Sequence, residues 1–221
     1  MHCIDIHTHQ IPAGTGKLFI MNRFPENHLV ELPPGGFYSV GLHPWFIGSE
    51  KVFKNQLEQL ESLLKLDGVI AVGECGLDKV CKTDFQLQLD VFLRQCAMAE
   101  SVNKPVITHS VKAWNDLVHL RRKLKPKVPW ILHGYTGNEM VTMQLLQQDF
   151  YFSFGSALLD EKSPARKSIG LIPKERLFFE TDEDGLSVTS VYETASEILE
   201  IKKEKLGEQI EWNFRQVFVR E

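Results

Sequence analysis

Imidazole and carboxylate side chains recur where the apolar segments of this chain end. The first such segment, residues 3–7, contains Asp5 and His7 and is followed at once by His9. In a β-strand alternate residues share a face, so His7 and His9 point to the same side. Later apolar segments also end in metal-binding side chains, and the full set is His7, His9, Glu74, His109, His133 and Asp182. These residue types in this pattern predict a metal site.

The number of these ligands indicates two ions rather than one. A lone zinc ion takes three or four protein ligands, and this set exceeds that. Glu74, at the end of the middle segment, is the natural bridge between two ions. Two ions about 3.5–4 Å apart clamp the attacking and leaving oxygens of a displacement and supply hydroxide near neutral pH. Mixed imidazole and carboxylate ligation suits Zn, Mn, Ni or Fe, and Mg is also open.

The segments that carry these residues read as strands that alternate with helices. Most of the apolar runs are continuous, as expected of strands buried on both faces. The predicted strands are residues 3–7, 17–22, 37–43, 69–74, 105–109, 128–133, 150–155 and 177–182. Apolar residues at helical spacing predict helices near residues 53–64, 84–103, 114–124, 141–146, 160–170, 191–199 and 207–219.

This alternation predicts an α/β fold, a (β/α)₈ TIM barrel formed by one domain over residues 1–221. The carboxyl ends of the strands then converge on one face, which is where the metal-binding side chains lie. The stretches QIPAGTG and NRFPENHLVELPPGG, which separate the first three strands, carry no helical pattern. We therefore expect an abbreviated barrel with helices missing or short in its first third.

Composition excludes several classes of protein. The formal net charge is -4 and the isoelectric point about 6.1, so no bulk basic field indicates nucleic-acid binding. The four cysteines form no CxxC pair, and no apolar run approaches the length of a membrane span. We expect a cytoplasmic protein with reduced thiols and no membrane partner. The sequence leaves the oligomeric state open, with a monomer favoured.

The order of the motifs resembles that of the TatD family of metal-dependent deoxyribonucleases, within the amidohydrolase-like barrels. The motifs are DIHTH at residues 5–9, GLHP at 41–44, GECGLD at 73–78, PVITH at 105–109, HGYTG at 133–137 and ETD at 180–182. The resemblance implies a compact TIM barrel with two divalent ions that hydrolyses phosphodiester bonds of DNA, as single strands or at DNA ends.

The resemblance also implies a role for each site residue. One ion would be held by His7, His9, Glu74 and Asp182, and the other by Glu74, His109 and His133. Asp182 would in addition orient the attacking hydroxide. His43, usually a pocket residue in the family, would contact the substrate phosphate or the leaving group.

The chain departs from the family pattern beside the predicted phosphate site. The family motif continues His-x-Arg after the fifth strand, whereas here His109 is followed by Ser110 and Val111, with Lys112 next. The planar guanidinium of arginine makes two parallel hydrogen bonds to a phosphate, whereas valine supplies neither donors nor charge. Glu183 and Asp184 add acids after the last strand. We expect a weaker grip on phosphate, with Lys112 as a point charge that contacts substrate.

Other residues carry weaker signals. Trp45 is either a base-stacking platform at the pocket rim or part of the rim packing. Asp5 is either a partner of an imidazole ligand or a structural hydrogen-bond acceptor. Asp78 is expected to hold its loop, and Cys75 to pack in the core. The basic cluster within residues 121–127 is expected to be a solvated surface rather than a DNA track.

Two other classes of function remain open. Small-molecule amidohydrolases use the same barrel, but often bridge their ions with a modified lysine where Glu74 stands. Phosphoesterases of the polymerase-and-histidinol-phosphatase type also begin with a DxHxH stretch, but close with Asp-x-His, where this chain has Asp182-Glu183-Asp184. A non-catalytic scaffold is the remaining class, and the presence of every expected ligand argues against it.

Overall fold

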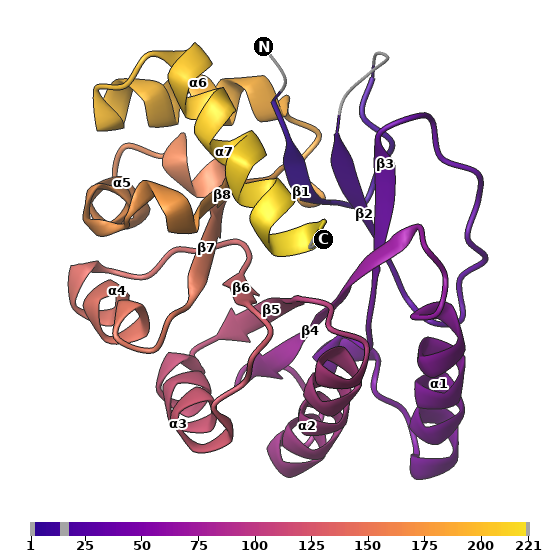
Figure 1. Cartoon of the computed structure of the whole chain (residues 1–221). Helices are drawn as coiled ribbons and strands as arrows, with labels where there is room; N and C mark the ends of the chain where they lie inside the picture. Colours follow the sequence, from indigo (N-terminus) through magenta and orange to yellow (C-terminus); the bar gives the residue numbers. More distant parts are fainter. Residues whose placement is uncertain (1–2, 14–17, 220–221) are drawn as a thin grey trace.

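Parallel strands form a sheet that curls into a barrel in the computed structural model, which describes residues 3–13 and 18–219 (Figure 1). The sheet has eight strands, and each pairs with the next in chain order. The strands are β1 (Asp5–Thr8), β2 (Phe19–Arg23), β3 (Gly36–Val40), β4 (Val69–Asp78), β5 (Val106–Val111), β6 (Trp130–Leu132), β7 (Tyr151–Phe154) and β8 (Leu177–Phe179). This is the TIM-barrel arrangement that the alternation of strands and helices predicts.

The barrel closes between its first and last strands at the carboxyl ends. The backbone N–H of Asp182 donates to the carbonyl of His7 at 2.9 Å, and the N–H of His9 donates to the carbonyl of Asp182 at 3.2 Å. Thr8 and Asp182 form a parallel bridge at the same junction. We refer to this junction, between β1 and the residues that follow β8, as the seam of the barrel. The closure therefore joins the chain segments that carry three of the predicted metal ligands.

Helices cover the outside of the barrel from β3 onward (Figure 1). They are α1 (Glu50–Leu63), α2 (Phe85–Ser101), α3 (Trp114–Leu124), α4 (Glu139–Leu146), α5 (Ala165–Ser168), α6 (Val188–Leu199) and α7 (Lys203–Phe218). Short 3₁₀ turns are η1 (Pro44–Phe46), η2 (Ser156–Leu158), η3 (Ile169–Leu171) and η4 (Lys174–Arg176). Side-chain caps fix three of the starts, since Asp84 accepts from Leu87 N, Asn138 from Val141 N and Ser187 from Thr189 N. None of the described helices is both long enough and apolar enough to cross a bilayer.

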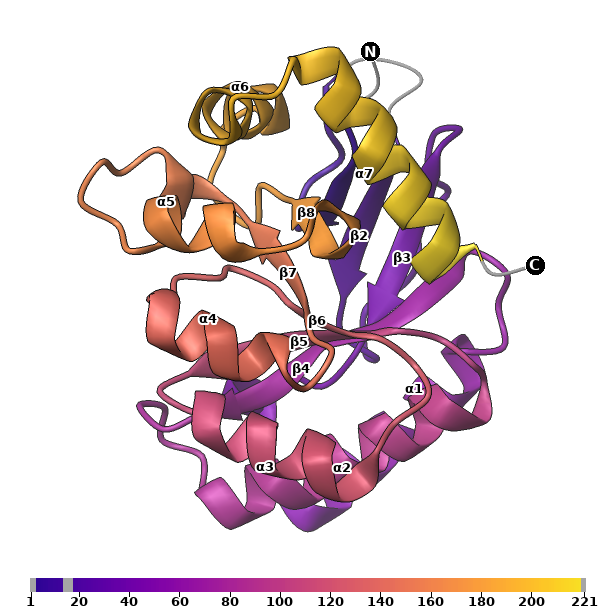
Figure 2. The same cartoon turned by 60° about the vertical axis from the view of Figure 1, so that its left-hand side comes forward.

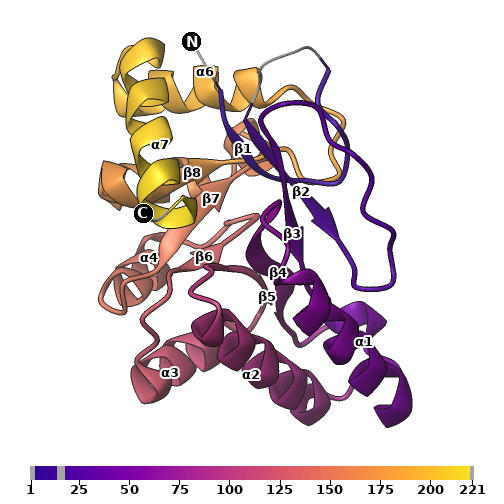
Figure 3. The ribbon, with the colours of Figure 1, turned by 45° about the vertical axis from the view of Figure 1, so that its right-hand side comes forward.

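The first third of the barrel has no helix between β1 and β3 in the described residues, as the sequence predicts. Figure 3 shows the connection from β2 to β3 running as a loop. The last helix, α7, lies instead across the outer side of this region (Figure 2). The ring of Phe214 is 6.0 Å from that of Phe37 on β3, and Phe218 is 5.6 Å from Phe178 on β8. The C-terminal helix thus buries apolar surface that the missing helices leave open.

Several predicted boundaries differ from the observed ones. β3 ends at Val40, so His43 lies beyond the strand as the cap of η1. β6 and β8 also end before His133 and Asp182, which occupy the following loops. The predicted helix over residues 160–170 shortens to α5 and η3, because Pro164 precedes it and Gly170 interrupts it.

The basic cluster within residues 121–127, which begins in the last turn of α3, is only partly a solvated surface, and the prediction is wrong for Arg121. This side chain is buried, and its guanidinium lies 5.6 Å from the Trp130 ring and 5.2 Å from the Phe150 ring. It donates to the carbonyls of Gln148 and Asp149. Burial lowers the pKa of Arg121 to about 10, so the group stays cationic and its cation–π contacts persist at neutral pH.

Candidate metal centre

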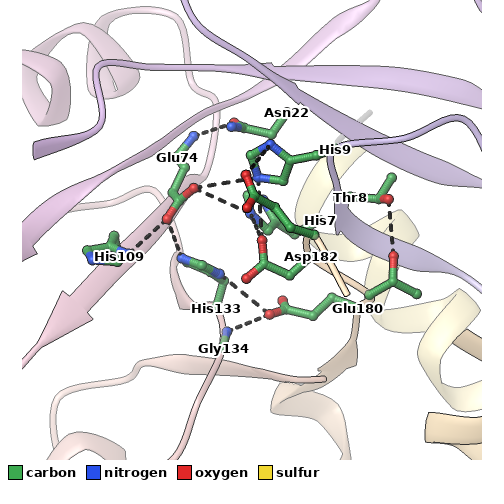
Figure 4. Close-up of polar contacts among 12 residues, drawn as sticks. His7, Thr8, His9, Asn22, Glu74, His109, His133, Gly134, Glu180 and Asp182 are labelled. Atoms are coloured by element: carbon green, nitrogen blue, oxygen red, sulfur yellow. Dashed lines mark hydrogen bonds and ion pairs between the residues drawn. The ribbon is translucent and has the colours of Figure 1, made fainter. Parts of the chain in front are cut away.

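Glu74 lies at the centre of the histidine cluster, near the mouth of the barrel (Figure 4). It is one of ten consecutive buried residues of β4, so the carboxylate projects from a rigid element. Its Oε1 is 2.8 Å from His109 Nδ1 and 2.7 Å from His133 Nε2. Its Oε2 is 3.5 Å from His7 Nε2 and 3.9 Å from His9 Nε2. One carboxylate thus faces His7 and His9 through Oε2, and His109 and His133 together with His43 through Oε1.

Asp182 completes the side of the cluster formed by β1. Its Oδ1 lies 3.5 Å from His7 Nε2 and 3.4 Å from His9 Nε2. The side chain is 39% exposed, whereas that of Glu74 is 7% exposed. Asp182 therefore reaches both the buried imidazoles and the solvent side of the cluster, where a water molecule or a substrate can approach.

The ligand atoms converge closely enough to hold cations. Three groups of side chains each bring one nitrogen or oxygen per residue within 4.8 Å of one another. They are His7, His133 and Asp182; His7, His9 and Glu74; and His43, Glu74 and His109. Glu74 belongs to two of these groups on opposite sides of its carboxylate. That is the position a bridging carboxylate needs.

The electrostatics of the cluster fit a bound cation. Burial opposes the charge of Glu74, but His133, His109 and His43 outweigh it and hold the pKa of the carboxyl well below its usual range. For His7, burial and the nearby His133 oppose protonation, but Asp182 and Glu74 outweigh them and raise the pKa to about 9. The acids favour positive charge in the site, and a bound divalent ion would supply that charge in place of protons.

Unsatisfied ring nitrogens support the same fit. Among the described residues, the buried His7 Nε2 and His9 Nε2 make no hydrogen bond, although each faces the carboxylates of Glu74 and Asp182. Buried polar atoms are ordinarily paired, so nitrogens left open around shared carboxylates are those of a ligand set. Two or more imidazoles with carboxylates suit Zn, Mn, Ni or Fe chemistry.

Two buried residues that the sequence analysis missed support the cluster from behind. Asn22, on β2, accepts the backbone N–H of Glu74 through Oδ1 at 2.6 Å, and the Ser39 hydroxyl at 3.2 Å. Glu180 Oε1 accepts the N–H of Gly134 at 2.5 Å and lies 3.5 Å from His133 Nδ1. A carboxylate behind an imidazole fixes which ring nitrogen faces the metal. Their positions in the sequence could have identified them, since Asn22 ends a predicted apolar strand and Glu180 is the first residue of the ETD motif.

Asp5 supports the seam rather than an imidazole ring. Its carboxylate accepts the hydroxyl of Thr181 at 2.7 Å and the backbone N–H groups of Thr181 and His7. Burial raises the pKa of Asp5 to about 7, against the lowering effect of the Thr181 hydrogen bond. Of the two roles open in the sequence, the structural one matches these contacts, and it holds the segment immediately before Asp182.

His43 and Trp45 lie on the opposite rim of the cluster. His43 Nδ1 accepts the backbone N–H of Trp45 at 3.2 Å, so in the neutral ring the proton is on Nε2. That Nε2 lies 3.2 Å from Glu74 Oε1. Trp45 is 59% exposed, and its indole N–H donates to Asp78 Oδ2 at 2.6 Å. Asp78 also accepts from Val80 N and therefore holds its loop, as the sequence predicts.

The remaining predicted residues make fewer contacts with the histidine cluster, or none. Lys112 follows β5 with an exposed side chain, and no hydrogen bond or ion pair links it to any described residue. Val111 shares its strand face with His109, which aims toward Glu74. Glu183 is exposed and its Oε1 lies 3.6 Å from His9 Nδ1. Cys75 is fully buried in the core, as predicted.

Sequence comparison connects this site to known proteins. Residues 27–219 match the family described as TatD related DNase. The uncharacterized metal-dependent hydrolase YabD of Bacillus subtilis is 32% identical over 149 residues, which cover 66% of this chain and 58% of that protein. The 3′-5′ ssDNA/RNA exonuclease TatD of Edwardsiella piscicida is 32% identical over 160 residues, or 70% of this chain and 61% of that protein. The matched part of the chain thus spans less than two thirds of either relative.

Solved structures share the complete fold. The crystal structure of YjjV, a TatD homologue from Escherichia coli, gives a TM-score of 0.84 at 21% identity and covers 99% of this chain and 98% of that one. A TatD-family hydrolase from Entamoeba histolytica gives 0.79 at 17% identity, with 98% of each chain covered. With the family match over residues 27–219, these findings show that the chain belongs to the family of TatD-related DNases.

Proposed function

We propose that the protein is a hydrolase that uses two divalent ions to cleave phosphodiester bonds of DNA, in single strands or at DNA ends. The observation that carries this proposal is the position of Glu74, whose two carboxylate oxygens face separate groups of imidazoles, His7 and His9 at one oxygen and His43, His109 and His133 at the other. A two-ion site of this kind suits in-line displacement at phosphorus. The relative from Edwardsiella piscicida, described as acting on single-stranded DNA and RNA, supports the choice of substrate.

The ligands divide into two sets around Glu74. His7, His9 and Asp182 would hold one ion with Glu74, and His109 and His133 would hold the other. Bound divalent ions polarise the phosphate and lower the pKa of a coordinated water, which is the chemistry that hydrolysis needs. Asn22 and Glu180 keep the bridge and the His133 ring in place.

The chain's own groups then position the reaction. The carboxylate of Asp182 is half-exposed and charged, so it accepts a hydrogen bond from the attacking water and aims its lone pair at phosphorus. As the new P–O bond forms, the bond from phosphorus to the leaving oxygen breaks. His43, whose Nε2 lies 3.2 Å from Glu74 Oε1, is proposed to contact the phosphate or the leaving oxygen from beside the bridging carboxylate.

Substrate contacts outside the cluster are proposed for Trp45 and Lys112. Asp78 fixes the exposed indole of Trp45 at the rim, which gives a base a preformed face on which to stack. Lys112 offers a mobile point charge in place of the planar guanidinium that Val111 replaces. Glu183 adds negative charge close to His9. Binding of the substrate phosphate is therefore expected to depend on the ions rather than on an arginine side chain.

A substrate panel tests the proposal. The purified protein, loaded separately with Zn, Mn or Mg, is incubated with single-stranded and duplex oligonucleotides, a chromogenic phosphodiester, phosphomonoesters and a set of amides. We expect cleavage of oligonucleotides and of the chromogenic diester, with no turnover after metal removal by a chelator. Turnover of amides or monoesters alone would contradict the proposal and favour a small-molecule hydrolase on the same barrel.

Asn22 gives a further prediction for the same site. Asn22→Leu removes the acceptor of the Glu74 N–H but preserves the size of the side chain, and we expect metal affinity to fall about 10- to 100-fold. Isothermal titration of the metal-free protein with Mn or Zn measures the change. Asn55→Leu, on the exposed face of α1, is the control and should bind metal as the wild type does. Equal affinity in both variants would show that Asn22 does not position the bridge.

A further inference from the structure

A pocket lies beside the seam between β1 and β8, next to the proposed metal centre. Its volume is about 340 Å³, and residues 10–13 after β1 and the loop that leads into α6 form its walls. Asp182 belongs both to this wall and to the histidine cluster. Glu183 also lines the pocket, while its Oε1 lies 3.6 Å from His9 Nδ1. A substrate group in the pocket therefore lies immediately beside the reacting phosphate.

The walls of the pocket suit an uncharged, flat group. Ile11, Pro12, Leu186 and Val188 contribute alkyl surface from both loops. The polar side chains are the carboxylates of Asp5, Asp182 and Glu183, the hydroxyls of Thr8, Thr181 and Ser187, and the amide of Gln10, and the described lining contains no lysine or arginine. Carboxylates repel a phosphate and accept N–H groups, so the pocket disfavours the charged backbone of DNA and suits a ring that carries amino groups.

We infer that this pocket binds the nucleobase of the nucleotide that adjoins the scissile phosphate, an inference that rests on the proposed phosphodiesterase function. Apolar walls from the two loops enclose the faces of the base, and Glu183 accepts from its amino group. The volume lies at the lower end of the range for small-molecule sites, which suits one base rather than an oligonucleotide. Phosphate binding at the ions and base binding here are thus separate contributions to substrate recognition.

Base recognition predicts discrimination against an abasic substrate. A single-stranded oligonucleotide that ends in adenine is compared with the same oligonucleotide whose terminal residue is abasic, at the 3′ end and at the 5′ end. Enclosing one base contributes binding free energy that the abasic substrate lacks. We therefore expect kcat/KM for the adenine-ended oligonucleotide to exceed that for the abasic one by about ten-fold or more, at the end that enters the pocket. The phosphodiester bond is identical in both substrates, so the ratio isolates the base.

Two glycines with open space around them, one in the pocket wall and one outside it, provide matched variants. A Cβ added at Gly185, in the pocket wall, meets no atom within 4 Å, and the same holds at Gly170 on η3, which does not line the pocket. Gly185→Trp places an indole at the pocket and should reduce the base-to-abasic ratio to about one. Gly170→Trp should leave the ratio at its wild-type value. Ala13→Trp fills the pocket from the opposite loop and should act as Gly185→Trp does.

A binding measurement without metal separates this inference from the proposed function. Saturation-transfer NMR with 2′-deoxyadenosine and metal-free protein should show signals from the base protons in the wild type and in Gly170→Trp. The base-proton signals should be absent with Gly185→Trp and with Ala13→Trp. If nucleoside binding follows this pattern but no oligonucleotide is cleaved, the proposed function fails and the pocket assignment stands. If oligonucleotides are cleaved with equal kcat/KM for base and abasic ends, or the signals persist in both pocket variants, the pocket assignment is overturned.

Discussion

Glu74→Gln is expected to reduce bound metal from two ions per chain to one at most, and to lower phosphodiester hydrolysis about a thousand-fold. A metal ion contributes several kcal/mol to transition-state stabilisation, and each 1.36 kcal/mol is about a factor of ten in rate. The amide keeps the shape of the side chain but removes the negative charge that faces His7 and His133. The hydrogen bond from the backbone N–H of residue 74 to Asn22 is unaffected, so β4 is expected to keep its place.

Equilibrium dialysis followed by elemental analysis measures the metal content of this variant. Glu58→Gln, at an exposed position of α1, makes the same chemical change away from the site and should retain both ions. Circular dichroism and the melting temperature check that both proteins are folded. A Glu74→Gln protein with the full metal complement would show that Glu74 is not a bridge, and the two-ion arrangement would fail with it.

Asp182→Asn is expected to lower kcat at least about 100-fold, the scale associated with loss of a positioned catalytic or electrostatic group. The acid is charged because its contacts with His7 and His9 outweigh burial and hold its pKa below the usual range. Asparagine loses that charge and presents a weaker acceptor to the attacking water. The backbone of residue 182, rather than its carboxylate, bonds to β1, so the seam of the barrel should survive the change.

Steady-state kinetics on one oligonucleotide, at saturating metal, measure this effect. Asp184→Asn, two residues along the same loop and exposed, serves as the matched control and should retain near-wild-type kcat. Metal content is measured on the same samples, because loss of an ion and loss of water orientation both reduce kcat. Turnover by Asp182→Asn within a few-fold of the wild type would remove Asp182 from the mechanism.

The sequence alone determined the residue types at the strand ends and the order in which they occur. His7 and His9 could be placed on one face because side chains alternate along a strand, a purely local property of the backbone. The continuous apolar run before Glu74 predicted a fully buried strand, and β4 is buried throughout. The absence of helical periodicity before β3 correctly predicted the missing helices, since a helix needs an apolar stripe to pack against the barrel.

Local patterns did not reveal residues whose importance depends on long-range pairing. Asn22 is an ordinary polar residue in the sequence, and only the curvature of the barrel brings its Oδ1, on β2, past β3 to the Glu74 N–H on β4. The position of Arg121 at a helix end, away from the carboxyl ends of the strands, predicts a solvated side chain. The fold instead packs it between Trp130 and Phe150, which are distant in sequence.

The tertiary structure also decided which atoms face one another at the site. The acceptor role of His43 Nδ1 could not be predicted from the residue order, because it depends on the turn at η1 that brings the N–H of Trp45 to this nitrogen. Closure of β8 onto β1 sets the distances from Asp182 to His7 and His9 and leaves a pocket beside the seam. The chemistry of each side chain and the spacing of apolar residues along a strand or helix are properties of the local sequence. Distances between strands depend instead on the curvature and pairing of the whole barrel.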